Sequence, residues 1–242
     1  MTAIFKREVS AYFRSPIGYI FLAAFYASSG VLFSITSVTQ NMQDGLLYLT
    51  TDIASMFSGL FFVRLGLLPI RTLTTLSEDK KNNTAQCLLT APVSLTALVC
   101  GKYLASFMVY VAGVAMTLVY AVVLSFFSEV IWLEVLGNVV GLVLVGAAFI
   151  AVGIFISSLT ENQVIAAVGG FVSMCVLYLI SAIAAVIPID WISQILMELS
   201  FADRYYTFTY GIFDFSNVLF FVSVAVVFVF FTVRVLERRR WN

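Results

Sequence analysis

Six long, uninterrupted apolar stretches dominate the pattern of hydrophobic and polar positions along the chain. Each is about 20 residues long, the length a helix needs to cross a hydrocarbon core about 30 Å thick. Outer-membrane strands instead alternate apolar and polar positions over about ten residues. The pattern therefore predicts an all-α integral membrane protein with six transmembrane helices. The predicted spans are residues 17–38, 53–76, 103–127, 135–159, 164–187 and 216–233.

The composition agrees with this prediction. Hydrophobic residues make up 62% of the chain, compared with about 45–50% in soluble domains. Five of the six runs contain no charged residue, as expected when a charge at the bilayer centre costs about 2.5 kcal/mol or more. The second run contains Arg64 and Arg71. Arg64 either faces the bundle or a translocation path, or pairs with an acidic group of the outer loops if the helix begins later.

The basic residues indicate how the chain is oriented. Six spans place both termini on one side of the membrane, and the opposite side contains Arg204 as its one basic residue. Basic residues concentrate in short cytoplasmic loops, so we expect both termini to be cytoplasmic. The basic residues on the expected cytoplasmic side are Lys6, Arg7, Arg14, Arg71, Lys80, Lys81, Lys102, Arg234, Arg238, Arg239 and Arg240.

The segment before the first span is amphipathic. Phe5, Val9, Tyr12 and Phe13 recur at helical spacing, with basic residues elsewhere. This favours an interfacial helix over about residues 3–15 that turns into the membrane at Pro16. An anchor that only supplies positive charge is an equally good interpretation.

The segment between the fifth and sixth spans, residues 188–215, is long and rich in aromatic residues. Ile189, Ile192, Ile195, Leu196 and Leu199 recur at helical spacing, which predicts a short helix on or in the outer leaflet. The aromatic cluster that follows is typical of an interfacial belt. The alternative is an outer gate formed by Tyr205, Tyr206 and Phe208.

Small residues four positions apart predict close helix packing in several spans, because small side chains let backbones approach each other in lipid. These pairs are Gly113 and Thr117, Gly137 and Gly141, Ala147 and Ala151, and Ala166 and Gly170.

Several kinds of chemistry are absent from the sequence. There is no histidine, which excludes the usual zinc protease sites, His-ligated haem and Ser-His dyads. No P-loop pattern occurs, and no predicted span has an acidic residue at its centre for ion coupling. Cys87, Cys100 and Cys175 suggest neither a disulfide nor a metal pair. We therefore expect no enzyme activity and no cofactor in this chain, so any energy must come from outside it.

The most polar stretch, residues 77–94, lies between the second and third spans. Asn83 and Gln86 are spaced as a capping box, which predicts a short helix from about Thr84 that stops before Pro92. Ser94 is placed to cap a second helix that continues into the third span. Exposed leucines on this elbow, Leu88 and Leu89, would be unfavourable in water and suggest docking into a protein groove.

This loop, together with the preceding amphipathic segment and first span, resembles the permease subunits of ABC-2-type exporters. The likeness is closest to the gliding-motility and nitrous-oxide-maturation branch, and it covers most of the chain in topology. Asn83 and Gln86 stand where the family commonly has Gly and Glu. The matching residues are Glu78, Asp79, Lys80, Lys81, Thr84, Leu88, Leu89, Thr90, Pro92, Val93, Gly101 and Lys102.

The resemblance implies a single permease domain over residues 1–242 and a separate ABC ATPase that holds ATP and magnesium. It implies a bacterial inner-membrane assembly of two permeases, identical or related, with two ATPases, and leaves room for an auxiliary outer-facing protein. The short loop between the fourth and fifth spans would make a second ATPase contact. The implied coupling residues are Glu78, Asp79, Lys80, Lys81, Asn83, Thr84, Gln86, Leu88, Leu89, Thr90, Pro92, Glu161 and Asn162.

Two other classes of function are considered. A membrane-embedded enzyme is disfavoured because no titratable groups converge in the sequence. A scaffold or channel-like subunit of a larger complex would have the same spans but would bind no ATPase. The cargo is not specified, although an aromatic, nearly uncharged interior suits a hydrophobic or amphipathic molecule.

Overall fold

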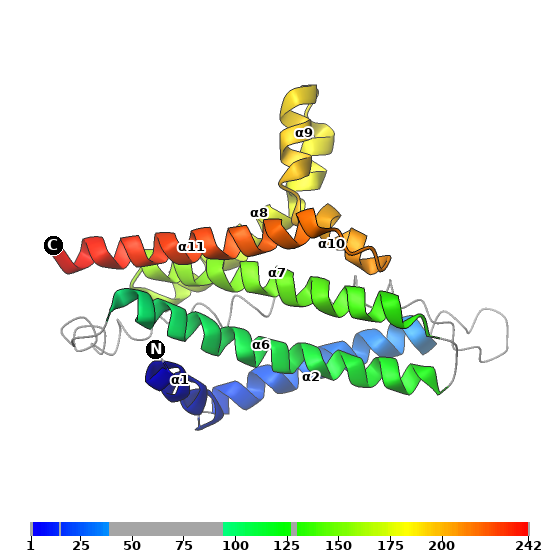
Figure 1. Cartoon of the computed structure of the whole chain (residues 1–242), viewed down its shortest axis with the longest axis horizontal. Helices are drawn as coiled ribbons and strands as arrows, with labels where there is room; N and C mark the ends of the chain where they lie inside the picture. Colours follow the sequence, from blue (N-terminus) through cyan, green and yellow to red (C-terminus); the bar gives the residue numbers. More distant parts are fainter. Residues whose placement is uncertain (1, 15, 39–93, 127–129, 242) are drawn as a thin grey trace.

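The chain forms a bundle of long helices with shorter helices at its ends (Figure 1). The computed structural model describes residues 2–14, 16–38, 94–126 and 130–241. These residues form helices and contain no strand, which confirms the predicted all-α class. The helices are α1 (Thr2–Arg14), α2 (Pro16–Val38), α6 (Leu95–Ser125), α7 (Trp132–Leu159), α8 (Gln163–Val186), α9 (Asp190–Glu198), α10 (Phe201–Thr209) and α11 (Phe215–Trp241).

Five of the described helices are long and apolar enough to cross a membrane, namely α2, α6, α7, α8 and α11. They coincide with five of the six predicted spans. The remaining predicted span, 53–76, lies outside the described residues. The protein is therefore a multi-pass helical membrane protein, and the count of six spans stays a prediction.

α6 and α11 extend furthest beyond the apolar runs that predicted them. α6 begins at Leu95, as expected for a helix that continues into the third span. Ser94 occupies the N-cap position with extended backbone, but its side chain makes no capping hydrogen bond, so the predicted side-chain cap is wrong. α11 continues to Trp241, and Arg234 pairs with Glu237 one helical turn later at 2.9 Å.

α7 lies between α6 and α11 and is the most buried of the candidate spans (Figure 1). Its small residues permit this position. A Cβ at Gly146 would overlap the ring of Tyr110 on α6, and the Tyr110 hydroxyl donates to the Leu142 carbonyl at 2.8 Å. Because apolar burial does not drive helix association in lipid, such close packing and interhelical hydrogen bonding hold the bundle together.

The small-residue pairs found in the sequence lie at helix contacts. Gly113 on α6 faces the ring of Phe25 on α2, which a Cβ would meet at 3.2 Å. Thr117, Ala151 and Ala166 are fully buried. These positions confirm the prediction of close packing.

Tyrosine hydroxyls join α6 to α2 and to α7. Tyr26 on α2 donates to the Ala112 carbonyl at 3.4 Å, and Tyr120 on α6 donates to the Tyr26 carbonyl at 3.3 Å. On the other side, Tyr103 donates to the Ala147 carbonyl of α7 at 3.3 Å. These bonds satisfy polar groups that would otherwise be costly in hydrocarbon.

The long helices run lengthwise through the bundle, which therefore has two distinct ends (Figure 1). α1, the start of α6, the turn between α7 and α8, and the end of α11 lie at one end, which we call the terminal end. α2 and α6 both run away from the terminal end. At the opposite end of the bundle, α10 lies on α7. α9 points away from the bundle, across the axes of the long helices.

Candidate functional site

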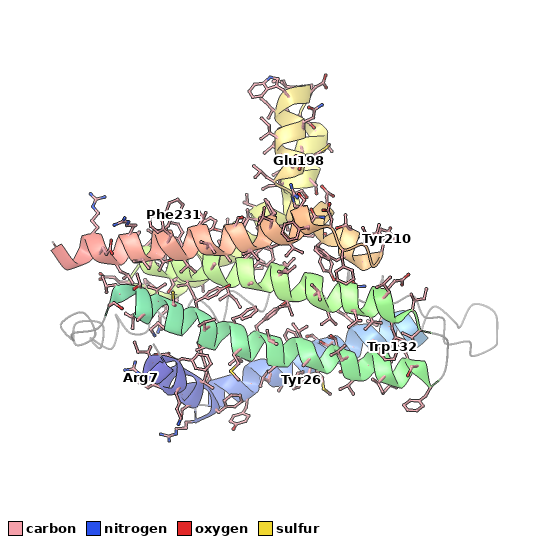
Figure 2. The ribbon with its side chains drawn as sticks, viewed as in Figure 1. Arg7, Tyr26, Trp132, Glu198, Tyr210 and Phe231 are labelled. Atoms are coloured by element: carbon pink, nitrogen blue, oxygen red, sulfur yellow. The ribbon has the colours of Figure 1, made fainter. Side chains whose placement is uncertain are left out.

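A buried ion pair joins α1 to α6 at the terminal end. Lys102 Nζ lies 3.3 Å from Glu8 Oε1, and the two side chains are 2% and 12% exposed. Arg7 Nη2 lies 3.2 Å from the same carboxylate oxygen, but its side chain is 59% exposed. Lys102 therefore provides the buried half of this charge cluster, and Arg7 points outward on α1 (Figure 2).

The contact between α1 and α6 continues on both sides of this ion pair. Gly101 lets the backbone of α6 approach Ile4, whose Cγ2 atom would lie 3.0 Å from an added Cβ. One turn along, the hydroxyls of Tyr12 and Ser106 form a hydrogen bond of 3.1 Å. The predicted N-terminal helix is thus present and packs along the first turns of α6. Its placement at the membrane interface stays a prediction.

The turn between α7 and α8 lies at the same end and presents two exposed predicted coupling residues, Glu161 and Asn162. Asn162 Oδ1 accepts a hydrogen bond from the Val164 amide at 2.9 Å and so caps α8. The Thr160 hydroxyl accepts one from the Asn162 amide at 3.2 Å. Two local caps therefore fix the shape of this short turn.

The other predicted coupling residues, from Glu78 to Pro92, lie outside the described residues, as does Arg64. Their proposed roles stay predictions. The structure does place Leu95, the first residue of α6, at the same end as Glu161 and Asn162 (Figure 1). The helix that follows the predicted coupling loop therefore starts at the end where the second predicted contact lies.

The predicted gate residues lie on α10, which packs closely onto α7. A Cβ at Gly137 would overlap the Phe208 carbonyl, and one at Gly141 would lie 2.9 Å from Phe208 Cβ. Tyr205 and Phe208 are consequently buried, at 2% and 0% exposure. Tyr206 on the other face of α10 is 43% exposed.

Asn138 is a buried polar residue of this contact that the sequence analysis did not identify. Its Oδ1 accepts a 3.3 Å hydrogen bond from the Tyr205 hydroxyl, and its Nδ2 donates to the Thr209 carbonyl at 3.4 Å. The sequence did contain a signal for this residue, because Asn138 is an asparagine within an apolar run, directly after Gly137. Sequence reasoning likewise missed the role of Glu8, because its partner lies on a helix far along the chain.

Across the described ranges, no three histidine, cysteine, aspartate or glutamate side chains converge to hold a metal ion. The described features at the terminal end are the exposed turn at Glu161 and Asn162 and the contact between α1 and α6.

These observations define a multi-pass membrane protein with an exposed polar turn between α7 and α8 at one end. Residues 13–176, more than half of the chain, match the family described as ABC-2 family transporter protein. The chain belongs to this family, whose members are membrane components of ABC transporters and associate with an ABC ATPase. No curated protein matches the chain.

Proposed function

We propose that the chain is the permease subunit of an ABC-2 exporter. A separate ABC ATPase would bind ATP and magnesium and hydrolyse ATP to drive export of a cargo through the permease. The family match over residues 13–176 carries this proposal.

The proposed topology has six spans with both termini in the cytoplasm of a bacterial cell. It is supported by the parallel direction of α2 and α6, the arrangement expected if one span, at 53–76, lies between them. The terminal end would then face the cytoplasm, in agreement with the distribution of lysine and arginine.

In the proposed coupling mechanism, the ATPase grips the loop at residues 78–92 and touches Glu161 and Asn162. Closure of two ATPases would push on α6 through the loop, and the packed helices would move as rigid bodies. Two permease copies, identical or related, would form the cargo path. Arg64 is a candidate lining residue and Tyr206 a candidate outer-gate residue. An auxiliary outer-facing protein would be a further partner.

Co-purification with an ABC ATPase from the cells that express the chain tests the proposal. We expect the wild-type chain to retain the ATPase and the double variant Leu88→Asp, Leu89→Asp to lose it. Ile131→Asp is the matched control, because Ile131 is 60% exposed and precedes α7 at the opposite end. It should retain the ATPase as wild type does.

A scaffold or channel-like subunit would behave differently. If the wild-type chain retained no ATPase, or if the two aspartates left binding unchanged, coupling through this loop would be wrong. The experiment needs no knowledge of the cargo.

A further inference from the structure

The short helix α9 is poorly anchored to the bundle. None of its residues is buried, and its 9 residues are fewer than an isolated helix needs to be stable in water, about 12–15. It packs beside the end of α8, where the Ser193 hydroxyl donates to the Ala184 carbonyl at 3.0 Å. Its order must therefore depend on a small number of contacts.

The side chain of Arg204 on α10 provides several of these contacts. Its Nε donates to the Glu198 carbonyl at 2.8 Å, and its Nη2 lies 2.7 Å from the Glu198 carboxylate. Glu198 is the last residue of α9 (Figure 2). One guanidinium thus pairs with the side chain of Glu198 and satisfies a terminal carbonyl of α9, where a positive charge also favours the helix dipole.

The same guanidinium connects α9 to α11. Arg204 Nη1 donates to Asn217 Oδ1 at 2.8 Å, and Asn217 Nδ2 donates to the Thr207 hydroxyl at 2.8 Å. The carbon of the guanidinium lies 4.4 Å from the ring centre of Phe220, within the range of a cation–π contact. The Arg204 side chain is only 16% exposed, so these contacts are partly shielded from solvent.

α10 is the fixed partner in this arrangement. It lies against Gly137 and Gly141 of α7 with Tyr205 and Phe208 buried, and its own N-terminus is capped by the Ser200 hydroxyl. Arg204 therefore extends from a rigid helix to a helix that has no buried residue of its own.

We propose that Arg204 is a positioning residue that orders α9 and sets its position relative to α10 and α11. When the Arg204–Glu198 contact opens, α9 loosens while the bundle stays intact. This proposal concerns the end opposite the chain termini and depends on neither the cargo nor the ATPase.

Hydrogen exchange of the full chain in lipid nanodiscs tests the proposal. In Arg204→Gln we expect amides of α9 to exchange about tenfold faster, because hydrogen bonds to a charged group are lost. Amides of α7, and of α11 beyond Phe220, should stay within about twofold of wild type. Glu198→Gln should accelerate α9 by about two- to fivefold, because it removes the ion pair and leaves the bond to the carbonyl. Arg234→Gln, which breaks an exposed pair at the terminal end, is the matched control and should leave α9 unchanged.

Two results would overturn the proposal. One is unchanged exchange of α9 in both Arg204→Gln and Glu198→Gln. The other is a parallel loss of protection in α7 and α11, which would make Arg204 a general stabiliser of the bundle. If Arg204→Gln does not fold, exchange of α9 relative to α7 and α11 in Glu198→Gln tests the proposal instead. The Glu198 side chain is 79% exposed, so we expect this variant to fold.

Discussion

At the scale of single residues, Lys102 is the most deeply buried charge in the described part of the chain. Its side chain is 2% exposed and pairs with Glu8 of α1. A buried charge is costly unless it is paired, so the two residues depend on each other. The pair fixes α1 against the helix that directly follows the proposed coupling loop.

Replacing Lys102 with Met should lower the free energy of unfolding by about 3 kcal/mol, because Glu8 would lose its buried partner. Denaturant unfolding of the purified protein in detergent measures this change. Arg234→Gln removes a pair whose side chains are 64% and 39% exposed, and should cost less than about 1 kcal/mol. The exchanged pair Glu8→Lys, Lys102→Glu should recover part of the loss. Equal stability of wild type and Lys102→Met would contradict this account of the contact between α1 and α6.

Gly146 is a second residue whose role follows from geometry. Gly146→Ala would place a methyl group against the Tyr110 ring, and we expect a loss of about 1–3 kcal/mol from overpacking. Gly169→Ala is the control, because its added Cβ would meet a side-chain methyl of Ile156 at 3.3 Å. That variant should be near neutral, since alanine favours a helix over glycine by about 1 kcal/mol. The same unfolding measurement tests this prediction. Equal effects of the two substitutions would show that the packing of Tyr110 does not require the space left by Gly146.

At the scale of elements, the turn between α7 and α8 is the described part of the proposed ATPase contact. Reversing its charge with Glu161→Lys should leave the fold intact and reduce ATP hydrolysis by the complex several-fold. Asp190→Lys, a similar reversal at an exposed position of α9, should leave hydrolysis unchanged. Equal hydrolysis in Glu161→Lys and wild type would remove this turn from the coupling surface.

The sequence predicts elements well where lipid dictates them. Apolar runs gave the five described spans, because a membrane tolerates little else. The start of α6 at Leu95 was also predictable, although the Ser94 hydroxyl does not accept the expected capping hydrogen bond.

Contacts between distant segments were not predictable in the same way. Tyr12 and Ser106 are 94 positions apart, and no local pattern pairs them or Glu8 with Lys102. For Tyr205 and Phe208, aromatic composition suited both an interfacial belt and a gate. The position of α10 depends on Gly137 and Gly141 of another helix, and it buries both side chains.

At the scale of the whole molecule, the two ends of the bundle differ in kind. The terminal end joins α1 to α6 through the Glu8–Lys102 ion pair and exposes the turn at Glu161. The other end carries α9 and α10, held by Arg204 and by close packing on α7. In the proposed exporter, the first end would receive the work of the ATPase and the second would face the outside.

Labelling from the two sides of the membrane tests this orientation most directly. With Cys87, Cys100 and Cys175 replaced by serine, single cysteines are placed at Lys80 and, as the opposite-end control, at Ile131. We predict that a membrane-impermeant maleimide labels Lys80→Cys only in inside-out vesicles and Ile131→Cys only in intact spheroplasts. Labelling of Lys80→Cys from outside intact spheroplasts would contradict the account, because no cytoplasmic ATPase could then reach the loop.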